Sequence, residues 1–239
     1  LKPAGYLAVV DGKFGDWQEN EPAGAEIKDY TGYSIAPGLV DTHIHGFAGQ
    51  DVMDNSAEAL KIMSKALLSA GVTSFLPTTL TAPFKELEDI CATIAETQTK
   101  VEGAKIQGIF FEGPFFTEEH KGAQNPAYMK NPDVQEFDAW QVAAKGLLKK
   151  IALAPEREGV VEFTKALKER GVTVALGHSN ATYNDAEAAV EAGATMWVHA
   201  YNGMRGLNHR EPGMVGAVFN LKDTVAELIC DGYHVHPVA

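Results

Sequence analysis

The feature that most constrains the fold of this chain is a repeated alternation of short apolar runs with amphipathic helical patterns, which begins at Ala36-Pro37-Gly38. In the first helical pattern, Ser56 is the expected N-cap and Gly71 the expected stop. The alternation predicts parallel strands joined by helical crossovers, and apolar runs such as residues 109–111 suit strands that are covered on both faces. Strands are expected at residues 39–44, 72–79, 106–111, 151–154, 172–176, 195–199 and 225–230.

Polar residues follow nearly every expected strand at its carboxyl end, which is where (β/α)₈ barrels build their sites. A TIM-like barrel that stops before its eighth strand therefore fits better than a doubly wound sheet. We assign residues 37–239 to this incomplete barrel. Residues 1–36 carry turn signals at Asp11-Gly12, Phe14-Gly15 and Thr31-Gly32 and are predicted to be part of a small β-sandwich domain.

Composition excludes several classes of function. The chain has 239 residues, of which 45% are hydrophobic and 22% charged, as expected for a globular protein. Its net charge of −12 disfavours nucleic acid and anionic membrane surfaces as partners. No apolar stretch is long enough to span a membrane, so a soluble cytoplasmic protein is expected. Cys91 and Cys230 lie far apart and indicate neither a disulfide framework nor a cysteine zinc site.

The sharpest motif is Asp41-Thr42-His43-Ile44-His45-Gly46, at the end of the first expected strand. Because side chains alternate along a strand, His43 and His45 share one face and can converge on one ion. Two such histidines alone are more typical of an exposed surface than of a metal site. Their position at a strand end favours metal binding.

Three further strands end in groups that can bind a metal. Glu112 follows an apolar run, and a buried carboxylate needs a compensating cation, although a strand end in solvent is the alternative. His178 and His199 close two later strands, where each alone is typical of a core histidine. Together the groups predict a site for zinc, iron or another divalent transition ion. The five candidate ligands are His43, His45, Glu112, His178 and His199.

Six motifs in a fixed order carry a family resemblance over essentially the whole chain. They read P-G-L-V-D-T-H-I-H-G, F-E-G-P-F, G-H-S-N-A, H-A-Y-N-G-M, R-E-P-G and D-G-Y-H-V-H-P. In these motifs the chain resembles the N-acetylglucosamine-6-phosphate deacetylases, a family of the amidohydrolase superfamily. The resemblance implies an amidohydrolase barrel, one or two divalent ions, a phosphorylated amino sugar as substrate and a homodimer.

The resemblance also implies roles for individual residues. Glu112, His178 and His199 would form the principal metal site, and His43 and His45 would add a second ion with Glu112 as the bridge. For the substrate, the guanidinium of an arginine offers a planar fork of donors that suits a phosphate. The implied substrate-binding residues are Asn202, Gly203 and Arg210 at the sugar phosphate, and His234.

Two positions depart from the family pattern. Gln124 stands where some members carry a histidine that polarises the acetyl carbonyl, and glutamine can donate a hydrogen bond there but has no positive charge. The catalytic aspartate implied by the resemblance is expected beyond Ala239, because Asp231 belongs to the D-G-x-H motif instead. No catalytic residue is therefore expected within residues 1–239.

The predicted reaction is hydrolysis of N-acetylglucosamine 6-phosphate to glucosamine 6-phosphate and acetate. Alternatives on the same scaffold are deacetylation of the galactosamine epimer or another amide hydrolysis. Hydrolysis of cyclic amides is less favoured, because the expected bridging group is Glu112 and not a lysine. An alternative of another class is an inactive protein that binds a metal or a sugar phosphate.

Overall fold

The computed structural model describes residues 5–239 and divides the chain into two compact units, Leu1–Pro37 and Gly38–Ala239. In the first unit, strands β1 (Tyr6–Val10) and β2 (Lys13–Gln18) form an antiparallel hairpin. The two turn residues, Asp11 and Gly12, have left-handed φ angles of 51° and 72°. Two consecutive left-handed residues match the twist of hairpin strands, so the Asp-Gly pair accounts for this turn.

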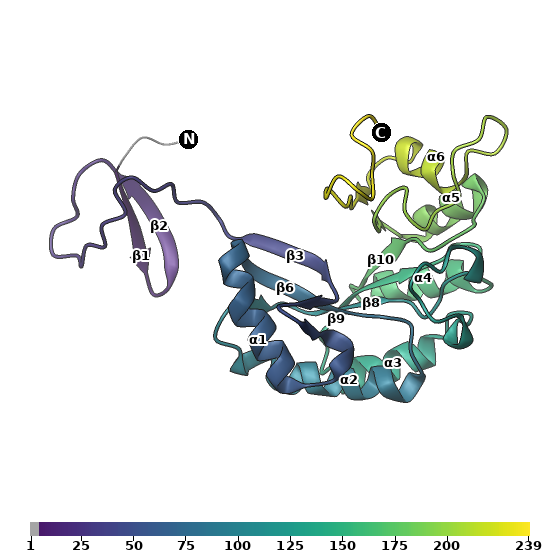
Figure 1. Cartoon of the computed structure of the whole chain (residues 1–239), viewed down its shortest axis with the longest axis horizontal. Coiled ribbons are helices and arrows are strands. Elements are labelled where there is room, and N and C mark those ends of the chain that lie inside the picture. Colours follow the sequence, from purple (N-terminus) through teal and green to yellow (C-terminus); the bar gives the residue numbers. More distant parts are fainter. Residues whose placement is uncertain (1–4) are drawn as a thin grey trace. The chain divides into compact units, whose positions relative to one another are not determined.

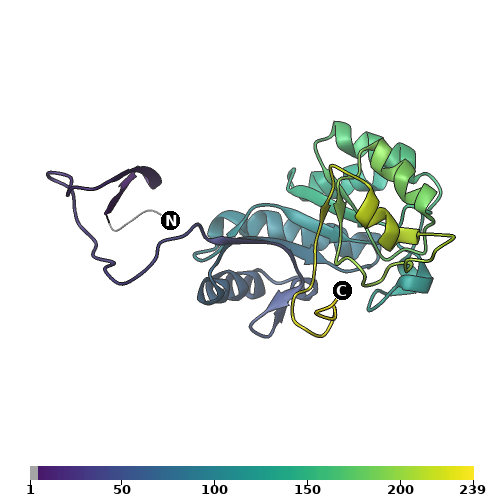
Figure 2. The same cartoon turned by 90° about the horizontal axis from the view of Figure 1, so that it is seen from above.

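The second unit contains a curled parallel sheet (Figures 1 and 2). Its hydrogen-bonded strands follow the order β12-β11-β10-β9-β8-β6-β3, with β7 beside β6. Spatial order thus follows sequence order, as repeated βα units predict. The strands are β3 (Leu39–Ile44), β6 (Val72–Thr79), β7 (Lys105–Ile106), β8 (Ile109–Glu112), β9 (Leu148–Leu153), β10 (Thr173–Leu176), β11 (Met196–Trp197) and β12 (Val225–Ala226). A short antiparallel pair, β4 (Gly46–Phe47) and β5 (Gln50–Asp51), follows β3.

Helices connect the strands and pack beside one another, α1 against α2, α2 against α3, α4 against α5 and α5 against α6 (Figure 1). In α1, the Ser56 side chain accepts a hydrogen bond from the Ala59 N–H, and Gly71 ends the short 3₁₀ turn after the helix with a φ of 75°. None of the helices among residues 5–239 is long and apolar enough to cross a membrane. The helices are α1 (Ala57–Leu67), α2 (Phe84–Thr97), α3 (Val134–Ala143), α4 (Val160–Glu169), α5 (Tyr183–Ala192) and α6 (Gly213–Asn220).

The middle strands of the sheet are buried on both faces, whereas the edge strands β3 and β12 are partly exposed. Phe111 on β8 belongs to a large core shared with helix residues such as Trp140 and Phe163, whereas its neighbour Phe110 belongs to a separate small cluster. Alternation along the strand sends these two rings to opposite faces. The small cluster also includes Ala152, Ala175 and Val198. Small residues on the second face leave room for the polar groups described below.

The structure corrects several expected boundaries. The strand expected at 106–111 is divided into β7 and β8, and the strand expected at 225–230 ends at Ala226. Two helices, α3 and α6, were not anticipated. In α3, Val142 is an exposed apolar residue that obscures the helical pattern, and α6 contains the poor helix formers Gly213 and Gly216.

Candidate metal centre

The five candidate ligands converge at the carboxyl edge of the sheet. His43 lies on β3 with His45 directly after the strand, and Glu112 is the last residue of β8. His178 and His199 follow β10 and β11 by two residues each. Because the carboxyl ends of parallel strands share one edge, residues far apart in sequence meet there.

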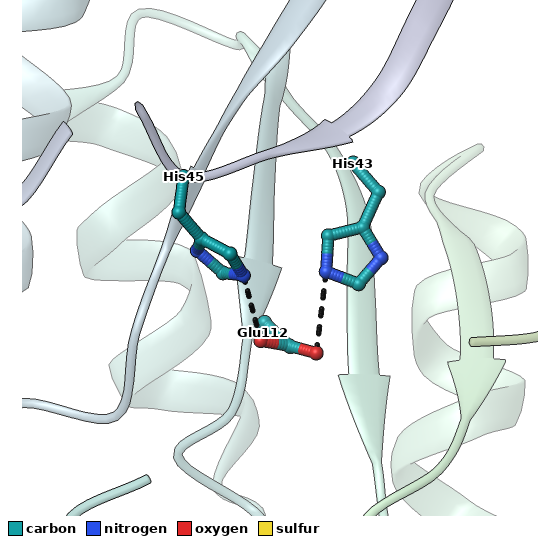
Figure 3. Close-up of side chains that lie close together, drawn as sticks. All are labelled: His43, His45 and Glu112. Carbon is teal, nitrogen blue, oxygen red and sulfur yellow. Dashed lines mark ion pairs between the residues drawn. The ribbon is translucent and has the colours of Figure 1, made fainter. Parts of the chain in front are cut away.

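Glu112 is the centre of this cluster. Its Oε1 atom lies 3.2 Å from His43 Nε2, 3.2 Å from His178 Nε2 and 3.0 Å from His199 Nε2. Its Oε2 atom lies 3.0 Å from His45 Nε2, and Figure 3 shows His43 and His45 on either side of the carboxylate. Two groups therefore share Glu112, one with His43 and His45 and one with His178 and His199, and within each group the ligand atoms lie within 4.8 Å of one another.

The outer nitrogen of each imidazole is already engaged. Three backbone carbonyls lie against Nδ1 atoms: Thr78 at 3.1 Å from His45, His120 at 2.8 Å from His178, and Asn202 at 2.9 Å from His199. A carbonyl only accepts, so each of these Nδ1 atoms carries a proton, and Nε2 is the ring nitrogen that faces the cluster and is available to an ion. This is the arrangement found around metal-bound histidines.

The donor set fits a divalent cation. His178 Nε2 and His199 Nε2 lie 3.1 Å apart, and both face the Glu112 carboxylate. Two ring nitrogens and a carboxylate this close together form a compact set of ligand atoms for a cation. Imidazole nitrogen and carboxylate oxygen without thiolate suit zinc, iron or a similar transition ion. The described residues could thus hold one ion in each of the two groups.

Burial and hydrogen bonding act against each other in the cluster. Burial disfavours the charge of Glu112, which is 3% exposed, but hydrogen bonds with the four histidines hold its pKa well below the usual value. Burial likewise lowers the pKa of His43, but hydrogen bonds with Glu112 and Glu227 outweigh it and raise the pKa to about 9. In the metal-free protein a proton on His43 therefore supplies a positive charge beside the Glu112 carboxylate.

Unusual backbone conformations hold the two later histidines. His178 and His199 have left-handed φ angles of 45° and 32°. A residue with a side chain rarely adopts such an angle, and strain of this kind concentrates at functional sites. Gly113, directly after Glu112, has a φ of 96°, and a Cβ atom there would collide with the Thr81 hydroxyl. Glycine is therefore required beside the central carboxylate.

Gln124 lies inside the cluster. It is 2% exposed, donates from Nε2 to Glu112 Oε2 at 2.7 Å, and accepts from the Thr81 N–H at 2.7 Å. These contacts fix the position of Glu112 from the long loop that follows β8. The substrate contact predicted for Gln124 stays a prediction.

The other predicted substrate residues differ in where they lie. Asn202 and Gly203 adjoin the histidines: the Asn202 Nδ2 atom is buried without a hydrogen-bond partner, and a Cβ on Gly203 would lie 3.1 Å from His178 Nδ1. Arg210 lines an open groove with Tyr183, Leu207 and Phe219, and His234 pairs with Asp231 at 2.6 Å in an exposed loop. Among residues 5–239, neither Arg210 nor His234 has a hydrogen bond or ion pair with the cluster.

Sequence reasoning missed two charged residues beside the cluster. Glu227 contacts His43, and the buried Lys150 forms an ion pair with Glu227. Glu227 carried a usable signal, since it is a charge within the apolar run 225–230. Lys150 carried little signal in the sequence, because the pair Lys149-Lys150 is typical of a basic surface. In the structure only Lys149 is exposed.

Comparisons with known proteins agree with this geometry. The chain matches the model of the Amidohydrolase family over residues 34–239. It is 44% identical to the N-acetylglucosamine-6-phosphate deacetylase of Vibrio furnissii over an aligned region of 206 residues. This region covers 86% of this chain and 52% of the relative. It is 42% identical to the N-acetylgalactosamine-6-phosphate deacetylase of Escherichia coli O157:H7 over an aligned region of 220 residues. This region covers 92% of this chain and 58% of the relative.

Solved structures confirm the predicted TIM-like amidohydrolase fold. The N-acetyl-D-glucosamine-6-phosphate deacetylase of Mycobacterium smegmatis has a TM-score of 0.89 at 29% identity, over 97% of this chain and 61% of that one. A mutant of the same enzyme in complex with N-acetyl-D-glucosamine-6-phosphate has a TM-score of 0.87 at 30% identity, over 98% of this chain and 61% of that one. The chain thus spans between half and two thirds of the length of these relatives. Because the matched region contains every strand of the curled sheet and all five candidate ligands, the chain belongs to the amidohydrolase family.

Proposed function

We propose that the protein containing this chain removes the acetyl group from N-acetylglucosamine 6-phosphate, giving glucosamine 6-phosphate and acetate. The observation that carries the proposal is the buried Glu112 carboxylate with four imidazoles aimed at it. Relatives at 42–44% identity named as deacetylases of phosphorylated amino sugars support this choice of reaction. The solved complex of a related enzyme with N-acetyl-D-glucosamine-6-phosphate supports the choice of substrate.

Within this proposal, Glu112 with His178 and His199 would hold the principal ion, and His43 and His45 with Glu112 would hold a second ion. Zinc and iron are the favoured ions, since both accept nitrogen and oxygen ligands. When bound, such an ion lowers the pKa of water toward neutrality and polarises a carbonyl, which are the two requirements of amide hydrolysis.

The residues of the chain contribute orientation and binding. The carbonyls of Thr78, His120 and Asn202 fix the rings of their histidines, so that each Nε2 atom stays aimed at the reaction centre. The unpartnered Nδ2 atom of Asn202 would donate to the sugar phosphate. Arg210 would pair with the phosphate, and His234 would contact the sugar. The proton-transferring aspartate implied by the family pattern is assigned to a position beyond Ala239.

Further proposals concern the rest of the protein. Residues 1–36 would belong to a small β domain, for which the β1–β2 hairpin is the support. We also propose a homodimeric cytoplasmic enzyme, on the family resemblance alone.

A second candidate substrate is N-acetylgalactosamine 6-phosphate, favoured by the Escherichia coli relative at 42% identity. The two sugars differ only in the configuration at one carbon, so the same metal centre serves either. The difference between them must be read by pocket residues that contact the sugar ring.

The test is acetate release by the complete gene product, measured on both phosphorylated epimers and on unphosphorylated N-acetylglucosamine, with and without a chelator. We expect release that the chelator abolishes, with kcat/KM highest for N-acetylglucosamine 6-phosphate. Higher kcat/KM on the galactosamine epimer would reassign the substrate. An absence of release from folded, metal-loaded protein on all three sugars would refute the deacetylase proposal.

A further inference from the structure

His43 differs from the other three histidines in what holds its ring. Each of the others has a neutral backbone carbonyl against Nδ1. His43 Nδ1 instead lies 2.9 Å from the Oε2 atom of Glu227, a residue 184 positions away in sequence. A carboxylate carries a full negative charge, so it orients the ring and also makes the opposite nitrogen a stronger ligand.

Glu227 is itself held from several directions. Its Oε1 atom accepts a hydrogen bond from the Thr42 hydroxyl at 3.3 Å and forms an ion pair with Lys150. Its backbone N–H donates to the Trp197 carbonyl at 2.9 Å, and its own carbonyl accepts from the Ala200 N–H at 2.8 Å. With both backbone groups and both carboxylate oxygens engaged, the side chain has little freedom to leave His43.

Lys150 is the least expected member of this group. It is 3% exposed, and its Nζ atom lies 4.0 Å from the centre of the Phe110 ring, which also packs edge-on against His43. A buried ammonium without a carboxylate partner is costly, so Lys150 depends on Glu227 as much as it restrains Glu227. Lys150 comes from the middle strand β9, and Glu227 from the segment after β12.

We propose that Glu227 is a positioning residue that prepares His43 for the metal position formed by His43, His45 and Glu112, and that Lys150 holds Glu227 in place. By accepting a hydrogen bond from the His43 Nδ1–H, Glu227 leaves Nε2, which lies 3.2 Å from Glu112 Oε1, as the ring nitrogen available to an ion. The effect is selective, because the Glu227 carboxylate has no hydrogen bond or ion pair with His178 or His199 among the described residues. The inference rests on the proposed metal site and is independent of the sugar that is deacetylated.

The experiment is a zinc titration of the complete, chelator-treated gene product against a competing chromophoric chelator. The wild-type protein should bind two equivalents. Glu227→Gln, which keeps the shape of the side chain and removes its charge, should weaken one equivalent by about 10–100-fold and leave the other unchanged. His43→Ala should weaken the same equivalent, and adding Glu227→Gln to His43→Ala should weaken it no further. Glu158→Gln, at an exposed glutamate, is the control.

Glu227→Gln leaves the Lys150 ammonium buried without a partner, so loss of both equivalents could follow from unfolding. Lys150→Met combined with Glu227→Gln removes both charges and should show the same selective loss in a folded protein. Wild-type affinity for both equivalents in this folded double variant would overturn the proposal, as would equal weakening of both. A His43→Ala protein that binds both zinc equivalents with wild-type affinity would also overturn it. If the variants show the selective loss of zinc affinity but the wild-type protein releases no acetate, only the proposed deacetylation is refuted.

Discussion

His43 on the first strand of the curled sheet is joined to Glu227, which follows the last strand, by a contact of 2.9 Å between Nδ1 and Oε2. In the described residues β3 and β12 share no ladder of hydrogen bonds. The two ends of the sheet are therefore linked at the mouth of the half-barrel by side chains. The same contact brings a second carboxylate close to the histidine cluster, and together with Glu112 it raises the pKa of His43.

The metal-free protein should lose stability as the pH rises through about 9. The pKa of His43 is raised to about 9 in the folded protein, against about 6.5 for a free imidazole. A raised folded pKa adds stability that is fully present below pH 6.5 and is lost as the pH rises past the folded value. Thermal unfolding of chelator-treated protein at pH 6.5 and 9.5 measures this. His43→Gln should flatten the difference, and an equal difference in that variant would show that another group is responsible.

Asn202→Ala should impair substrate binding with little effect on stability. The Asn202 Nδ2 atom is buried without a partner, so its removal breaks no hydrogen bond within the protein. If the amide donates to the sugar phosphate, KM should rise by about 10-fold, the loss of one hydrogen bond to a charged group. Steady-state kinetics and thermal unfolding together provide the measurement. A large fall in melting temperature with an unchanged KM would assign Asn202 to the fold instead.

Arg210→Met should weaken the preference for phosphorylated sugars. Arg210 is exposed, and its guanidinium has no ion pair among the described residues, so the unfolding free energy should change by less than about 0.5 kcal/mol. Loss of a charged fork to phosphate should lower kcat/KM by about 10–100-fold. Arg170→Met, at an exposed arginine paired with Asp138, is the matched control. Equal kinetic effects of the two substitutions would argue against a phosphate contact.

Trp140→Ala should lower the stability of the barrel without removing any of the candidate metal ligands. Trp140 is fully buried, stacks on Phe84 with ring centres 5.2 Å apart, and donates from its indole N–H to the Phe84 carbonyl. Truncation of such a side chain costs about 3–5 kcal/mol. Val142→Ala, on the same helix but 79% exposed, should cost less than about 0.5 kcal/mol. Denaturant unfolding compares the two, and similar losses would contradict the assignment of Trp140 to the core.

The sequence was sufficient to predict the cluster of histidines and Glu112 at the strand ends, because each of these positions is recognised from the residues next to it. His43, Glu112 and His199 each lie at or just beyond the carboxyl end of an apolar strand, and parallel strands bring those ends to one edge. The βα rhythm likewise predicted the order of the sheet. Element boundaries were less predictable where helix signals were weak, as in α6 with its two glycines.

The supporting residues were not predictable by the same reasoning. The contact of Glu227 with His43 depends on how far the sheet curls, and no periodicity in the sequence reports curvature. Lys150 is buried because its ammonium lies over the Phe110 ring, where Glu227 compensates its charge. For Gln124, the sequence indicated a position near the reaction centre, but only the folded loop shows that its amide contacts Glu112.

The measurement that tests the central claim most directly is the metal content and acetate release of Glu112→Gln in the complete gene product. Glu112 is the one side chain shared by both groups of candidate ligands, so its neutralisation should remove bound metal and deacetylation together. Glu158→Gln should retain both. A Glu112→Gln protein that keeps its full metal content and its activity would contradict the account of a carboxylate-centred metal site.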